Sequence, residues 1–226
     1  GEILFRTKLS ENLFEGLSPW MQKLPGGLIH VNVVGCALFA AISGSSAATV
    51  ATVGKMSIPE LRKRNYPEKI LLGSLAGSGT LGLLIPPSII LIIYGVTVQE
   101  SIAKLFVAGI IPGIMIALIF MSYVILWSLF NKKQMPNIVN QYSFIDKIKR
   151  SGQLIPVIIL ILSVIGSIYT GIATATEAAS LGVVGALILS YFQKSLSWST
   201  FKSSLLGATK TSCMISFILA GSAFLS

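Results

Sequence analysis

The sequence has 226 residues, of which 53% are hydrophobic and 11% are charged, and its formal net charge is +9. Charged residues normally make up about a quarter of a soluble domain, so this composition excludes a soluble globule, a disordered chain, collagen and a coiled coil. Several stretches of roughly 20 residues or more carry no charged side chain, and each is long enough to cross a bilayer. The sequence therefore predicts an all-α polytopic membrane protein.

The basic residues indicate how the chain is oriented in the membrane. Seventeen Lys and Arg residues stand against eight Asp and Glu residues, and they gather between the apolar blocks as the positive-inside rule describes. The clusters predict two cytoplasmic basic loops, 56–69 and 131–150. The intervening segment 97–104 has a single cation, Lys104, and is expected outside. This pattern differs from the basic face of a nucleic-acid-binding protein, so no nucleic acid is expected as a partner.

Residues 1–24 are interpreted as the end of a scaffold helix and an interfacial arm, and residues 25–55 as a re-entrant helical hairpin. Lys23 and Lys55 flank the apolar block, which must enter the membrane and return if both ends are cytoplasmic. Its middle, Ile-Ser-Gly-Ser-Ser-Ala, is a poor helix centre and a good turn. Each arm of about 13 residues spans roughly 20 Å of helix, against roughly 30 Å of hydrocarbon core. The tip is predicted at 43–46.

A broken transmembrane helix is predicted over 70–98. The Pro86-Pro87 pair cannot sit unbroken inside a helix. We expect a helix to about Leu75, an unwound stretch over 77–82, and a second helix after the prolines. Unpaired backbone groups at membrane depth persist only when they are buried in protein or line a polar cavity. A hairpin tip beside a broken helix at the same depth is typical of the binding site of a secondary transporter.

The residues at these two interruptions suit a sodium ion. Inside a membrane the least costly ligands for sodium are neutral oxygens, which the tip offers as hydroxyls and the broken helix offers mainly as backbone carbonyls. The expected sodium-binding residues are Ser43, Ser45, Ser46, Gly77, Gly79, Thr80 and Gly82.

The same interruptions suit an anionic substrate. A half-helix that begins at Ser45 or Ser46 points its N–H groups and its positive dipole end at the tip, which attracts a carboxylate. The expected substrate-binding residues are Ser45, Ser46, Thr49, Pro86, Pro87 and Ser88. The alternative is that these small residues only allow helix backbones to pack closely.

Residues 105–130 predict a further transmembrane helix, and residues 151–226 predict three scaffold transmembrane helices. Glu177 is the one acid inside an apolar stretch. It is either a functional intramembrane acid or, as we prefer, part of a structural cap made with Thr174 or Thr176. No nucleophile–base pair, paired carboxylate, phosphate loop or metal-ligand cluster occurs in the sequence. We therefore expect no enzyme activity, no organic cofactor and no metal other than sodium.

Five motifs occur in order along the chain, and together they resemble one family. They are Leu-Pro-Gly-Gly-Leu (24–28), Leu-Phe-Ala-Ala-Ile-Ser-Gly-Ser-Ser-Ala-Ala-Thr (38–49), Gly-Thr-Leu-Gly-Leu-Leu-Ile-Pro-Pro-Ser (79–88), Leu-Phe-Val-Ala-Gly-Ile-Ile-Pro-Gly (105–113) and Thr-Ala-Thr-Glu-Ala-Ala (174–179). Over its whole length the chain is similar to the large membrane subunit, the DctM-like M subunit, of tripartite ATP-independent periplasmic (TRAP) transporters.

The resemblance implies a multi-pass permease of the bacterial or archaeal cytoplasmic (inner) membrane with an ion-transporter-type elevator fold. It implies sodium symport of a small organic acid, of the C4-dicarboxylate, sugar acid or sialic acid class. The implied partners are a periplasmic substrate-binding protein (P type) and a small membrane subunit (Q type), within the lipid bilayer. By this resemblance the hairpin and the broken helix belong to the moving transport domain. The first sodium site falls on Ser43, Ser45, Ser46 and the backbone near Gly79 and Gly82.

Two other functions stay open at this point. One is a sodium–carboxylate elevator permease that works without a binding protein, and the other is a membrane scaffold subunit whose hairpin only packs. The second hairpin and second Pro-Pro break of the family do not occur in these residues, so we expect an incomplete second repeat and a longer subunit. The sequence does not identify the substrate, because selection in this family is expected to reside largely in the soluble binding protein.

Overall fold

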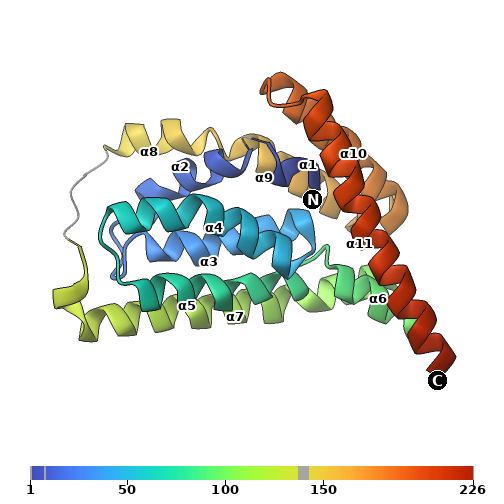
Figure 1. Cartoon of the computed structure of the whole chain (residues 1–226), viewed down its shortest axis with the longest axis horizontal. Coiled ribbons are helices and arrows are strands. Elements are labelled where there is room, and N and C mark those ends of the chain that lie inside the picture. The colour runs from blue at the N-terminus through green and yellow to red at the C-terminus, as the bar shows by residue number, and fades with distance from the viewer. Residues whose placement is uncertain (1, 8, 137–142, 226) are drawn as a thin grey trace.

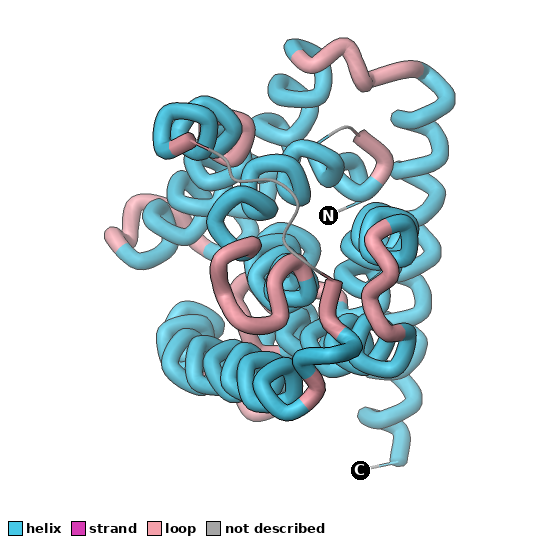
Figure 2. Tube along the Cα trace, turned by 90° about the vertical axis from the view of Figure 1, so that its left-hand side faces the viewer, coloured by secondary structure: helices cyan, strands magenta, loops and turns pink. Residues whose placement is uncertain are grey.

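The computed structural model describes residues 2–7, 9–136 and 143–225, and every regular element in these ranges is a helix (Figures 1 and 2). This agrees with the all-α class expected from the composition. The described helices are α1 (Glu2–Phe5), α2 (Leu9–Met21), α3 (Ile29–Ser43), α4 (Ser46–Lys63), α5 (Glu68–Gly79), η1 (Thr80–Leu83, 3-10), α6 (Ile89–Thr97), α7 (Ile102–Phe130), η2 (Lys132–Gln134, 3-10), α8 (Phe144–Ser151), α9 (Ile155–Tyr169), α10 (Ala175–Phe192) and α11 (Trp198–Leu225).

Helices α3 and α4 form a hairpin. α3 ends at Ser43, Gly44 and Ser45 make the turn, and α4 begins at Ser46 and packs back along α3. The turn lies inside the predicted tip. The arms are longer than expected, at 15 and 18 residues, because α4 continues to Lys63. Most of α3 is apolar and buried, as befits a helix that contacts α2, α4, α5, η1 and α7.

The second interruption lies further along the chain than the sequence predicts. α5 continues to Gly79 and η1 follows to Leu83, so the expected helix end near Leu75 and the unwound stretch over 77–82 are wrong. The backbone stays helical there because a glycine keeps its N–H donor and its carbonyl acceptor, and each glycine destabilises a helix by only about 1 kcal/mol relative to alanine. The non-helical segment is 84–88, where two prolines lack N–H donors and restrict the residue before them.

Within the described ranges, three helices are long and apolar enough to cross a membrane, namely α7, α10 and the Trp198–Gly221 part of α11. Helices α8 and α9 meet at a bend of 51° and add a fourth span if they count as one. Only 17% of the apolar window of α7 is buried inside the protein. Such exposed apolar surface suits helices that face lipid, and it agrees with a polytopic membrane protein.

Figure 1 shows α3, α4, α5 and α7 running alongside one another, with α2 and α8 along one side and α11 crossing the far end at a steep angle. The buried core joins the first three of these helices to α2 and α9 through side chains such as Leu17, Phe39, Val53, Leu75 and Val157. Helix α8 begins inside the predicted basic loop 131–150 and ends one residue after it, so this segment is partly helical. Residues 137–142 lie outside the described residues.

Candidate functional site

The tip of the hairpin contains the end of one helix and the start of the next. Gly44 has a φ of 63°, and its N–H donates to the Ala40 carbonyl at 2.9 Å, which closes α3 with a left-handed residue. The Ser45 hydroxyl accepts a hydrogen bond from the Ala48 N–H at 3.4 Å and so caps α4. Ser-Gly-Ser-Ser is therefore a complete helix–helix turn in four residues.

Several predicted ligand oxygens are hydrogen-bonded within the tip. The Ser43 and Thr49 hydroxyl oxygens lie 2.9 Å apart. The Thr49 hydroxyl and N–H both donate to the Ser45 carbonyl, at 2.7 and 3.0 Å. The Thr49 side chain is fully buried. These hydroxyl and carbonyl groups therefore stabilise the conformation of the tip through bonds with one another.

The break after η1 lies directly against the tip. The Ile89 N–H, at the start of α6, donates to the Gly44 carbonyl at 3.1 Å. A Cβ atom added to Gly44 would lie 2.7 Å from the Pro87 carbonyl oxygen, and the Pro86-Pro87 peptide bond is cis. The tertiary structure thus brings the hairpin tip and the break in the second helix together, as the sequence analysis expected.

Two glycines bring the end of α5 and η1 against the start of α4. A Cβ atom on Gly82 would lie 2.8 Å from the Ser46 nitrogen, and one on Gly79 would overlap the Val50 side chain. Only glycine allows this close backbone approach without movement of the neighbours. Both residues therefore lie beside the tip as predicted, although their backbone is helical.

A groove of about 390 Å³ opens between α4 and the end of α5. Its lining consists of Ser46, Ala47, Val50, Ala51, Ala76, Gly79 and Thr80. Among the predicted sodium-binding residues, Ser46, Gly79 and Thr80 therefore share one cavity. The Thr80 hydroxyl donates to the Gly77 carbonyl at 2.7 Å, while in the described part of the chain the Ser46 hydroxyl has no hydrogen-bond partner. The groove offers hydroxyl oxygens among small apolar side chains.

The other predicted residues surround this groove without lining it. A Cβ atom on Gly77 would lie 3.2 Å from the Phe120 ring of α7, so Gly77 serves a helix contact on the opposite side. Ser88 is fully buried, and its hydroxyl donates to the Leu83 carbonyl at 2.7 Å. Ser43 and Ser45 lie in the tip, Thr49 lies in the first turn of α4, and Pro86 and Pro87 lie in the break.

The sequence analysis missed Asn32, a fully buried polar residue in α3, the first arm of the hairpin. Its Nδ2 donates to the Leu71 carbonyl at 3.2 Å and to the Ser74 hydroxyl at 3.0 Å, which ties α3 to α5. An amide inside the apolar run 28–42 was the available signal, since a buried amide needs partners. Asn32 holds the two helices that carry the tip and the break.

Glu177 belongs to a capping box at the start of α10. The Thr174 hydroxyl oxygen accepts from the Glu177 N–H at 3.3 Å, and a Glu177 carboxylate oxygen accepts from the Thr174 N–H at 2.8 Å. Both residues are exposed. This geometry is the structural cap preferred in the sequence analysis.

Comparison with known proteins gives a family match over the whole chain. The model of the family described as "Tripartite ATP-independent periplasmic transporter, DctM component" matches residues 1–226. The chain is 35% identical to the C4-dicarboxylate TRAP transporter large permease protein of Pseudomonas aeruginosa, over 97% of this chain and 51% of that protein. It is 35% identical to an isethionate TRAP transporter permease protein of Oleidesulfovibrio alaskensis, over 94% of this chain and 33% of that protein.

A third relative is named for a different kind of solute. The chain is 32% identical to the ectoine/5-hydroxyectoine TRAP transporter large permease protein of Ruegeria pomeroyi, over 83% of this chain and 43% of that protein. The chain thus spans about half the length, or less, of these relatives.

Proposed function

The chain belongs to the DctM component family of tripartite ATP-independent periplasmic (TRAP) transporters, and on that premise we propose that it is part of a sodium-coupled permease for a small organic acid. The family consists of transporter permease subunits, which are integral membrane proteins and not enzymes. The observation that supports the proposal most directly is the junction of the tip and the break, made by the Ile89–Gly44 hydrogen bond beside a groove with hydroxyl groups.

Sodium binds, in this proposal, at the groove end nearest the tip. Ser46 offers a hydroxyl oxygen without a competing hydrogen bond in the described structure, and Thr80 offers a second hydroxyl oxygen with lone pairs besides the one bond that it donates. Backbone carbonyls near Gly79 and Gly82 complete the ligands. Ser43, Ser45 and Thr49 act mainly by holding the tip in shape through their mutual hydrogen bonds.

The substrate carboxylate binds, in this proposal, at the N-terminal end of α4. This helix has 18 residues, and the N–H groups of its first turn have no partners inside the helix. Two of the N–H groups near this end already have acceptors: the Ala48 N–H donates to the Ser45 hydroxyl, and the Thr49 N–H donates to the Ser45 carbonyl. The earlier N–H groups, at Ser46 and Ala47 beside the groove, are the donors that we assign to the carboxylate.

The transport step is an elevator movement in which the hairpin and broken helix travel together. The support for this step is the packing of α3 against α4, α5 and η1, the Asn32 hydrogen bonds and the tip–break junction, which join these elements into one block. The full-length subunit works with a small membrane subunit and receives its substrate from a periplasmic binding protein. The substrates named for the relatives differ, so we propose the small organic acid class and no single substrate.

The experiment is uptake by the full-length subunit, with its small membrane subunit and binding protein, in proteoliposomes. Labelled C4-dicarboxylate, isethionate and ectoine are offered separately, with and without an inward sodium gradient. We expect uptake of at least one solute that requires both sodium and the binding protein. Sodium-dependent uptake without the binding protein would favour the simpler elevator permease, and uptake without sodium would contradict the proposal.

The Ser46→Ala variant tests the sodium site itself. Loss of one neutral oxygen interaction of about 1 kcal/mol should raise the sodium concentration for half-maximal uptake several-fold. The matched control is Ser167→Ala on α9, whose hydroxyl donates within its own helix to the Val164 carbonyl. An unchanged sodium requirement in Ser46→Ala, at normal expression, would support the packing role of the tip.

A further inference from the structure

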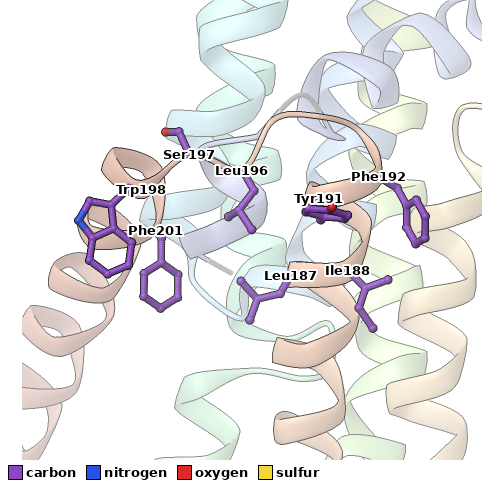
Figure 3. Close-up of a pocket in the computed structure, with 8 residues that line it drawn as sticks. All are labelled: Leu187, Ile188, Tyr191, Phe192, Leu196, Ser197, Trp198 and Phe201. Atoms are coloured by element: carbon purple, nitrogen blue, oxygen red, sulfur yellow. The ribbon is translucent and has the colours of Figure 1, made fainter.

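A second groove lies at the turn between α10 and α11, and its volume is about 820 Å³. Its lining residues come from the end of α10, the connecting turn and the start of α11, as Figure 3 shows: Leu187, Ile188, Tyr191, Phe192, Leu196, Ser197, Trp198 and Phe201. The sodium and substrate proposal uses none of these residues. The lining is almost entirely apolar, so the groove suits a hydrocarbon chain better than a free polar solute.

The groove lies at the end of two candidate membrane spans. α10 and the first part of α11 both qualify as spans by length and composition, so the turn between them lies where the hydrocarbon core meets the headgroups. Tyr191 is 72% exposed and Trp198 is 79% exposed, and the Trp198 ring stacks on Phe201 with centroids 5.8 Å apart. Tyr and Trp are enriched at this depth because their rings combine apolar and polar surface.

Two lysines flank the groove. Lys194 stands in the turn, directly after the lining residue Phe192 and Gln193, and Lys202 follows the lining residue Phe201. Both side chains are exposed, and neither forms an ion pair within the described residues. The sequence has no Asp or Glu after Glu177. Helix α1 packs against α10 and α11 and brings Glu2 beside Gly207, but the Glu2 carboxylate is ion-paired with Arg6 at 3.3 Å.

We propose that this groove binds an anionic phospholipid, with an acyl chain along the aromatic and aliphatic lining and the phosphate beside Lys194 and Lys202. The charge complementarity selects this occupant, because an uncharged lipid would leave both lysines without a counterion. A free phosphate would find no polar pocket in the apolar lining. A second protein segment would need acidic groups facing Lys194 and Lys202, together with an apolar surface to fill the groove. This site is separate from the sodium and substrate site and does not depend on it.

The test uses tryptophan fluorescence of the full-length subunit in complex with its small membrane subunit. Trp198 is the single tryptophan that is kept, and all others are replaced by phenylalanine. The complex is reconstituted in phosphatidylcholine vesicles, and phosphatidylglycerol with brominated acyl chains is then titrated in. We expect saturable quenching of Trp198, and weaker quenching when brominated phosphatidylcholine replaces brominated phosphatidylglycerol. The difference should shrink in high salt, since the lysines are exposed.

The variants Lys194→Gln and Lys202→Gln should each reduce the preference for the anionic lipid about fivefold, because each exposed cation near a membrane contributes a similar factor. Lys210→Gln is the matched control, since Lys210 is an exposed cation on α11 that does not line or adjoin the groove. Equal quenching by both lipids, or equal loss of preference in the Lys210 variant, would overturn the proposal. Absence of quenching would also overturn it and would mean that protein covers the groove.

Discussion

Gly44 shapes the candidate site through its backbone conformation, its carbonyl group and its lack of a Cβ atom. Its positive φ ends α3, its carbonyl accepts from Ile89, and its missing Cβ leaves room for the Pro87 carbonyl. Gly44 therefore joins the tip to the break through backbone groups alone, which a change in the serine side chains would not disturb.

We predict that Gly44→Ala destabilises the full-length protein more than Gly171→Ala does. Gly171 has a similar φ of +73° but no atom within 4 Å of an added Cβ. Both variants should lose about 1 kcal/mol or somewhat more from the left-handed backbone. Only Gly44→Ala adds the clash with Pro87, which overpacking data place at about 1–3 kcal/mol.

Thermal unfolding of both variants in detergent, together with uptake, measures this difference. Gly44→Ala should also lose transport, whereas Gly171→Ala should keep it. Equal melting temperatures and equal uptake in the two variants would mean that the tip and the break are not coupled.

At the scale of single elements, the start of α10 shows how a local pattern can imitate a functional acid. Glu177 lies in an apolar stretch, yet its carboxylate accepts from both the N–H and the hydroxyl of Thr174, and its own N–H donates back. An acid in the first turn also complements the positive end of the helix dipole. The cap accounts for the residue without a role in ion binding.

Removing this cap should affect stability before transport. Thr174→Ala removes both hydrogen bonds of the threonine hydroxyl, keeps the one that the Thr174 N–H donates, and should cost about 1 kcal/mol of unfolding free energy. Glu177→Gln keeps an oxygen acceptor and loses the charge, so its cost should be smaller, about 0.3–1 kcal/mol. Detergent melting and the sodium dependence of uptake are the measurements. A Glu177→Gln variant with normal melting and no sodium-driven uptake would assign the acid to the ion pathway.

The position of the break after η1 is decided by proline and not by glycine. The sequence placed it over the glycines 77–82, whereas the structure places it at 84–88. A glycine weakens a helix by only about 1 kcal/mol, while a proline in the interior costs about 3 kcal/mol. The prolines therefore decide where the helix stops, and Gly79 and Gly82 serve close packing instead.

For the molecule as a whole, the cations and the arm lengths predict how the hairpin lies in the membrane. Cations on both flanks of the apolar block predict that the hairpin enters and leaves on the same face. The arms of 15 and 18 residues correspond to roughly 22 and 27 Å of helix, still short of the roughly 30 Å hydrocarbon core.

Single cysteines introduced into the full-length protein test this arrangement, in a background in which Cys36 and Cys213 are serine. Lys23→Cys and Lys63→Cys stand at exposed positions on either side of the hairpin and should react with a membrane-impermeant reagent from the cytoplasmic face only. Gln99→Cys, in the exposed turn between α6 and α7, is the control and should react from outside. Labelling of Lys23→Cys and Lys63→Cys from opposite faces would mean that the block crosses the membrane.

The amino-acid sequence by itself determined the class of the protein, its family resemblance, the position of the hairpin turn and the presence of a break at the Pro-Pro pair, but it began that break too early, over 77–82. These features follow from local properties: the length of apolar runs, the distribution of cations, and the conformations available to glycine and proline. Short ordered motifs added the family resemblance, which the family match over residues 1–226 confirmed.

Only the tertiary structure decided which of the candidate oxygens lie in one cavity. Ser46, Gly79 and Thr80 share a groove, whereas the side chains of Thr49 and Ser88 are buried and donate hydrogen bonds to backbone carbonyls. Residue types cannot reveal this distinction, because every hydroxyl is both a donor and an acceptor until its neighbours are known. The partners of a hydroxyl depend on how helices distant in sequence pack together, and that packing is set by the side chains of α3, α4 and α5 jointly.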